Sequence, residues 1–179
     1  MDKELSEVLS SEEVFRGRLV SVVRDTVREG EQTYLREVVG HPGGAAAVPL
    51  FADGSVAFVS QYRHPARKYL LELPAGKLDP GERPDEAAAR ELEEELGVVA
   101  GRLEQLSGFY TTPGFCAERL WVFLATELRE TARRHEEDEI IEVVRMPFAR
   151  ALELVAAGEI EDAKTIVGLL LAAQRVGTL

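Results

Sequence analysis

The sequence predicts an α/β protein of the α+β kind, with an antiparallel sheet at its N-terminus. Two observations predict this class. Short runs rich in β-branched residues, separated by turns that contain Gly, Pro or Asp, occupy the first part of the chain. Three later segments place apolar residues at helical spacing, namely 85–96, 147–157 and 163–176.

The N-terminal region is expected to form a small antiparallel sheet. Residues 14–27 and 33–39 are rich in β-branched residues, and the polar turn at 28–32 separates them. We therefore expect a first region at 1–40 and a second region at 41–179.

The second region is predicted to begin with a hairpin of central strands. Two apolar runs, 45–51 and 55–62, follow the turn HPGG and flank Ala52-Asp53-Gly54. An Asp-Gly pair between apolar runs favours a hairpin because both residues tolerate the backbone of a tight turn.

The rest of the chain is predicted to alternate between strands, loops and helices. The loop candidates are 75–84, which is rich in Gly and Pro, and 107–115, which contains aromatic residues. Asp162 is placed to cap the last helix. The remaining strand candidates are 68–74, 120–128 and 139–147.

Composition limits the functions that fit this chain. Its 179 residues suit one domain, and its net charge of −11 disfavours nonspecific binding to nucleic acid or to an anionic membrane. A phosphate substrate would need local neutralisation by divalent cations or a few arginines. A single cysteine, no long apolar run and an acidic N-terminus lead us to expect a cytoplasmic protein.

The predicted helix at 85–96 has an apolar face and an anionic face. Ala88 and Leu92 recur on the first, whereas Glu91, Glu94 and Glu95 lie on the second. Like charges at this spacing disfavour a helix by a few tenths of a kcal/mol each. Runs of glutamate are usually solvated, but hard oxygen ligands in this number also suit Mg²⁺ or Mn²⁺.

The residues around this helix favour the metal interpretation. They match the pattern G-x5-E-x7-R-E-U-x-E-E-x-G-U, where U is apolar, and the chain is thereby identified as resembling the Nudix hydrolases. The matching positions are Gly76, Glu82, Arg90, Glu91, Leu92, Glu94, Glu95, Gly97 and Val98.

Further segments resemble the ADP-ribose pyrophosphatase branch of this family. They include QYRHPARKYLLELPAGKLDPGE before the box, FYTTPGF after it and IEDAKTIVGLL near the end. A proline about 16 residues beyond the box is typical of this branch, and Pro113 matches it. The resemblance implies an α/β/α sandwich with a mixed central sheet, and an N-terminal sheet that contributes to a homodimer and to substrate contact.

The resemblance also implies a role for each residue of the box. Glu94 would be a further carboxylate of the site, and Arg90 would orient Glu82 or Glu94 by a charge-assisted hydrogen bond. Two or three Mg²⁺ ions, or Mn²⁺ in their place, would acidify a water and neutralise the pyrophosphate. The metal ligands would be the carbonyl of Ala75 with Glu91, Glu95 and Glu82.

A general base and the substrate contacts are expected outside the box. The acidic segment 136–139 supplies candidate bases, and Glu139 matches the family position. Arg63 matches an arginine that contacts the diphosphate, and Arg36 one that reaches the adenine from the partner subunit. Glu118 matches a glutamate near the terminal ribose, although the family usually has an acid where this chain has Ala117.

Histidines and the cysteine do not predict another site. His41, His64 and His135 are not spaced as zinc ligands, and lone histidines in turns are usually structural or solvated. Cys116 has no sequence partner and fits a small buried residue better than a nucleophile.

The expected reaction is hydrolysis of ADP-ribose to AMP and ribose 5-phosphate, and two alternatives stay open. The same box serves hydrolases of other substrates, such as GDP-mannose or dinucleoside polyphosphates; Pro113 argues against the latter. Some Nudix domains bind nucleotides without cleaving them, because a fold does not fix a function. Such domains commonly lose box carboxylates, whereas this chain keeps all of them.

Overall fold

The structure is a computed structural model that describes residues 6–133 and 141–178. The chain divides into two compact units. One contains the described residues up to Gly43 together with Tyr110–Arg119, and the other contains Gly44–Phe109 with the described residues from Leu120 onward. Among the described residues, no helix is both long and apolar enough to cross a membrane.

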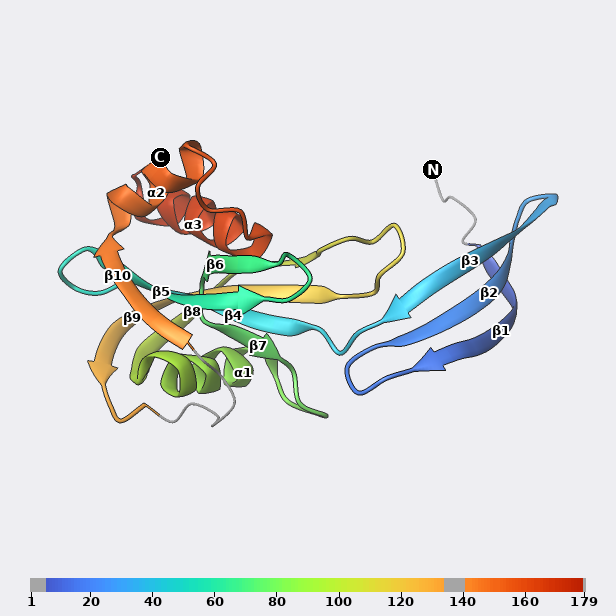
Figure 1. Cartoon of the computed structure of the whole chain (residues 1–179), viewed down its shortest axis with the longest axis horizontal. Coiled ribbons are helices and arrows are strands. Elements are labelled where there is room, and N and C mark those ends of the chain that lie inside the picture. Colours follow the sequence, from blue (N-terminus) through green and yellow to red (C-terminus); the bar gives the residue numbers. More distant parts are fainter. Residues whose placement is uncertain (1–5, 134–140, 179) are drawn as a thin grey trace. The chain divides into compact units, whose positions relative to one another are not determined.

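The first unit contains a three-stranded antiparallel sheet in the order β1-β2-β3 (Figure 1). Its strands are β1 (Glu7–Arg16), β2 (Ser21–Glu29) and β3 (Gln32–Gly40). The predicted antiparallel sheet is present, and the segment 14–27 contributes to two of its strands because the chain turns at Gly17, whose N–H donates to the Val20 carbonyl at 2.8 Å.

The second unit contains two sheets. In the first, β4 (Gly44–Pro49) lies between β7 (Ala75–Lys77), which is antiparallel to it, and β9 (Arg119–Glu130), which is parallel. In the order β7-β4-β9-β8, this mixed sheet ends with β8 (Val98–Tyr110). The other sheet has the order β10-β5-β6, with the bounds Ile141–Pro147, Ser55–Arg63 and Lys68–Glu72.

The hairpin predicted around Asp53-Gly54 was only partly right. The tight turn forms, with Gly54 at φ 78° and its N–H donating to the Phe51 carbonyl at 3.0 Å. However, the flanking strands separate after one bridge between Leu50 and Val56, because β4 already pairs with β7 and β9, and β5 with β6 and β10. The turn therefore leads from one sheet into the other.

Helices cover both faces of the mixed sheet (Figure 1). On β4, Ala45 and Ala47 pack with α1 (Pro84–Glu91), while Ala46 and Val48 pack into the core that includes α2 (Phe148–Ala156) and α3 (Ala163–Val176). The alternation follows the two-residue period of a strand. The expected α/β/α sandwich with a mixed central sheet and an N-terminal antiparallel sheet is thus confirmed.

The helices lie close to their predicted bounds, with two differences nearby. The segment predicted as one helix at 85–96 changes from α1 to a π-helical turn, η1 (Leu92–Leu96), which ends at Gly97 with φ 67°. The strand β8 was not predicted, and it includes the first residues of the predicted loop at 107–115. Asp162 caps α3 as predicted, by accepting from the Thr165 N–H at 2.9 Å.

Candidate active site

The candidate site is built where η1 and the end of α1 face β7. Glu91 and Glu95 are buried, with 9% and 4% of their surface exposed. The Glu95 carboxylate accepts a hydrogen bond from the Ala75 N–H at 3.0 Å. Two carboxylates one turn apart are thus drawn out of water beside the backbone of Ala75 and Gly76, an arrangement that requires compensating positive charge or donors.

Gly76 makes this approach possible. A Cβ built at Gly76 would lie 1.7 Å from Oε1 of Glu91 and 2.3 Å from its carboxyl carbon. No side chain fits that space while Glu91 keeps its position. The glycine of the box is therefore explained by the close approach of a carboxylate to the strand backbone.

Arg90 gathers the other carboxylates of the box. Its Nε and Nη2 donate to the two oxygens of Glu82 at 2.9 and 3.1 Å, and its Nη1 donates to Glu91 at 2.7 Å and Glu94 at 2.9 Å. A further bond from Nη2 reaches the Lys77 carbonyl at 3.1 Å. Arg90 therefore binds both Glu82 and Glu94, which were predicted as alternative partners.

These contacts shift the pKa values of the groups involved. The hydrogen bond from Arg90, helped by the Asp79 N–H, holds the pKa of the Glu82 carboxyl below its ordinary value although burial opposes the shift. Hydrogen bonding to Glu82 and the charge of Glu91 raise the pKa of Arg90. Both groups therefore stay charged at neutral pH.

The donors present fit a hard divalent cation. Within residues 6–133 and 141–178, no three His, Cys, Asp or Glu side chains converge as a preformed metal site. Two carboxylates, Glu91 and Glu95, nevertheless lie beside the backbone of Ala75, and Mg²⁺ commonly binds one or two protein carboxylates while keeping several waters. Both oxygens of Glu82 are bonded to Arg90, so the structure favours an orienting part for Glu82 over direct ligation.

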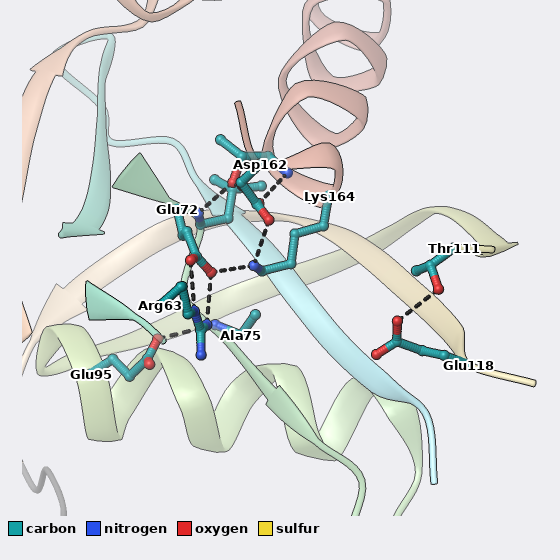
Figure 2. Close-up of polar contacts among 10 residues, drawn as sticks. Arg63, Glu72, Ala75, Glu95, Thr111, Glu118, Asp162 and Lys164 are labelled. Carbon is teal, nitrogen blue, oxygen red and sulfur yellow. Dashed lines mark hydrogen bonds and ion pairs between the residues drawn. The ribbon is translucent and has the colours of Figure 1, made fainter. Parts of the chain in front are cut away.

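Arg63 lies at the end of β5, close to Glu95 of this pair (Figure 2). Its Nε and Nη2 form a bidentate ion pair with Glu72, with both distances 2.7 Å, and its side chain is 40% exposed. The hydrogen bond to Glu72 raises the pKa of Arg63, and the charge of Glu95 adds to this effect. Arg63 is thus a fixed cation near Glu95.

The residues that hold Arg63 were not among the predicted site residues. Glu72 is 1% exposed and also pairs with Lys164, which binds Asp162 at 3.0 Å (Figure 2). A lone acid in the apolar run KYLLELP was the available signal, since a buried charge is almost always paired. Its partners are distant in sequence, so only the fold identifies them.

The other predicted substrate residues belong to the first unit. Glu118 accepts from the Thr111 hydroxyl at 2.7 Å, and one of its oxygens lies 3.4 Å from Nδ1 of His41. Arg36 is exposed on β3, with its guanidinium carbon 4.7 Å from the Tyr34 ring centre. Pro113 is exposed in the segment between β8 and β9.

The remaining predicted residues are the general base, the histidines and the cysteine. Glu139, with the other candidates at 136–138 and His135, lies outside the described residues. The Nδ1 of His41 accepts from the Gly43 N–H at 3.1 Å, which is a turn contact. His64 is exposed, and Cys116 is a free, partly buried thiol.

With this geometry established, the class of protein follows. The NUDIX domain matches residues 40–167, so the chain belongs to the NUDIX family. It is 41% identical over 167 residues to the ADP-ribose pyrophosphatase of Bacillus subtilis (strain 168), covering 91% of this chain and 90% of that one. It is 42% identical over 168 residues to the ADP-ribose pyrophosphatase of Mycobacterium tuberculosis (strain ATCC 25618 / H37Rv), covering 92% and 81%.

The chain is also similar to another relative and to a solved structure. The chain is 37% identical over 164 residues to the methanol dehydrogenase activator of Bacillus methanolicus, covering 90% of this chain and 89% of that one. The crystal structure of an ADP compounds hydrolase matches with a TM-score of 0.86 at 24% identity over 100% of both chains. At that identity the likeness concerns the fold.

Replacing Gly76 by alanine tests the close approach of Glu91. We expect Gly76→Ala to fold, because the carboxylate end of Glu91 can move aside, but to bind Mg²⁺ roughly tenfold more weakly since a candidate ligand is displaced. Calorimetric titration with Mg²⁺ measures this. Gly114→Ala, where a Cβ meets nothing within 4 Å, is the control. Unchanged Mg²⁺ affinity in Gly76→Ala would contradict the role of this approach.

The lowered pKa of Glu72 predicts an acid-sensitive stability. Burial raises the pKa of Glu72, but hydrogen bonds from Arg63 and Lys164 and the charges of both lower it below its ordinary value of 4.5. A lowered folded-state pKa contributes stability that is present above 4.5 and lost as the pH falls further. In urea unfolding, we expect the free energy of unfolding to fall less between neutral and acidic pH for Glu72→Gln than for the wild type. An equal fall in the free energy of unfolding for both proteins would contradict this prediction.

Proposed function

We propose that this protein hydrolyses the pyrophosphate bond of ADP-ribose in a Mg²⁺-dependent reaction, giving AMP and ribose 5-phosphate. The observation that carries the proposal is the buried pair Glu91 and Glu95 beside Ala75 and Gly76, with an intact box around it. The two relatives named ADP-ribose pyrophosphatase, similar over most of the chain, support ADP-ribose as the substrate.

Within the proposed site, Glu91, Glu95 and the Ala75 carbonyl would hold Mg²⁺, with two or three ions per site and Mn²⁺ as a substitute. Bound Mg²⁺ supplies neutralisation of the diphosphate charge and acidification of a water. Arg90 keeps the carboxylates of Glu82, Glu91 and Glu94 oriented, which its four hydrogen bonds to them support.

Four further residues are proposed to contribute to substrate binding or catalysis. Arg63 would bind the diphosphate, since a guanidinium matches phosphate oxygens and this one is fixed near Glu95. Arg36 of the partner subunit would reach the adenine. Glu118 would contact the terminal ribose, beside the segment that contains Pro113. Glu139 would accept the proton of the attacking water; this assignment rests on the family resemblance alone.

A homodimer is proposed in which region 1–40 forms the contact and region 41–179 carries the hydrolase. Every residue of β1 is exposed, and the apolar side chains Phe15 and Leu35 are 54% and 65% exposed. Exposed apolar side chains gathered on one sheet are typical of a protein interface. The single cysteine supports a reducing, cytoplasmic location.

Release of AMP from ADP-ribose tests the activity. We expect turnover with Mg²⁺, none with chelator, and slower turnover of GDP-mannose and of a dinucleoside polyphosphate. Glu95→Gln should lower kcat by roughly 10²-fold or more, because it removes a charged metal ligand. Glu139→Gln should lower kcat by 10²-fold or more as well, through loss of the base.

Glu93→Gln is the matched control for Glu95→Gln, because Glu93 lies in the same turn but at a variable position of the box. Its kcat should stay within about twofold of the wild type. Preferred turnover of GDP-mannose would replace the substrate. Binding of ADP-ribose without turnover of any substrate would instead indicate a nucleotide-sensing module.

The proposed dimer is tested by Leu35→Glu. Burying a new charge at an apolar interface is costly, so we expect this variant to sediment as a monomer and the wild type as a dimer. Leu170→Glu changes a 40% exposed leucine on α3 and should leave the dimer intact. A monomeric wild type, or a dimeric Leu35→Glu, would contradict this interface.

A further inference from the structure

An ion-pair network surrounds Glu72. Glu72 ends β6 and is 1% exposed, yet it receives two hydrogen bonds from Arg63 and one from Lys164. A buried carboxylate is costly unless it is paired and hydrogen-bonded, and here both oxygens are used. The position of the Arg63 guanidinium is therefore determined from the interior of the protein.

The network continues into the start of α3. Lys164 also binds Asp162 at 3.0 Å, and Asp162 caps α3 by accepting from the Thr165 N–H at 2.9 Å. The buried Thr165 hydroxyl accepts from the Leu73 N–H at 2.8 Å, on the residue that follows Glu72. The C-terminal helix is thereby connected to the same corner at which Ala75 meets Glu95 (Figure 2).

The way in which Glu72 holds Arg63 leaves part of the guanidinium for another anion. Glu72 occupies Nε and Nη2, which form one edge of the planar fork. The other edge, formed by Nη1 and the second N–H of Nη2, has no hydrogen-bond partner among residues 6–133 and 141–178. Glu72 also shares its charge with Lys164, so it does not fully neutralise Arg63. The Arg63 side chain is 40% exposed, which allows contact with a ligand.

We infer that Glu72 and Lys164 are positioning residues that act through Arg63, holding its guanidinium so that the free edge receives the diphosphate of the substrate. The inference rests on the proposed function, because it gives Arg63 a diphosphate ligand. It assigns Lys164, in the first turn of α3, to the support of the substrate site. A fork fixed on one edge loses little further freedom when its other edge binds phosphate, which increases affinity.

A double-mutant cycle on nucleotide affinity tests this inference. The probe is ADP with Mg²⁺, measured by calorimetry, because it carries a diphosphate and the readout needs no turnover. In the wild-type background, we expect Glu72→Gln to weaken ADP binding roughly tenfold. In an Arg63→Ala background, the same change should weaken binding less than about twofold, since the residue through which it acts is missing.

If Glu72→Gln fails to fold, Lys164→Met provides a second variant. It removes one partner of Glu72 and leaves the ion pair of Arg63 and Glu72 in place. It should weaken ADP binding, also only when Arg63 is present, and Lys164→Arg should restore most of the affinity. Glu161→Gln is the matched control, since Glu161 precedes Asp162 and pairs with exposed Lys68 outside the network. It should bind ADP as the wild type does.

The outcomes separate this inference from the proposed function. Equal losses in the wild-type and Arg63→Ala backgrounds, or no loss in either, would overturn the inference, because Glu72 would then be merely structural. A wild type that fails to bind ADP would also overturn it. Absence of ADP-ribose turnover in a wild type that shows the expected cycle would overturn the proposed function and leave the positioning of Arg63 supported.

Discussion

Arg90 neutralises several carboxylates at once, and the rest of the site depends on it. In a chain of net charge −11, the turn that contains Glu91, Glu94 and Glu95 would repel itself. One guanidinium binds Glu91 and Glu94 within the helix and Glu82 in the preceding loop, and it also reaches the Lys77 carbonyl. The same contacts therefore stabilise the helix end and fix the loop against it.

The carboxylate pair also depends on where the backbone can approach it. Gly76 on β7 leaves room for Glu91, and the adjacent Ala75 N–H binds Glu95. The strand β7 is short and pairs with β4, whose small residues allow α1 to pack closely above it. The central sheet thus serves as a rigid support, as expected for a site that has to hold charged groups at fixed positions.

Two arginines of the second unit, Arg90 and Arg63, have different electrostatic roles. Each guanidinium nitrogen of Arg90 donates to a carboxylate or to the Lys77 carbonyl, so Arg90 organises the anionic turn. Arg63 is bound on one edge by Glu72 and its side chain is 40% exposed, so it is able to receive an anion. The difference comes from their partners, since both side chains carry the same charge.

The sequence by itself determined the parts of this protein that depend on local pattern. Helical periodicity and the Asp162 cap predicted α3, and box spacing predicted the carboxylates of one turn and their arginine. Only the tertiary structure decided that the turn at Asp53-Gly54 leads into another sheet, and that Glu72, Lys164 and Arg63 meet. Strand partners and buried ion pairs join residues far apart in the chain, and no local spacing specifies which of many possible partners the packed core brings together.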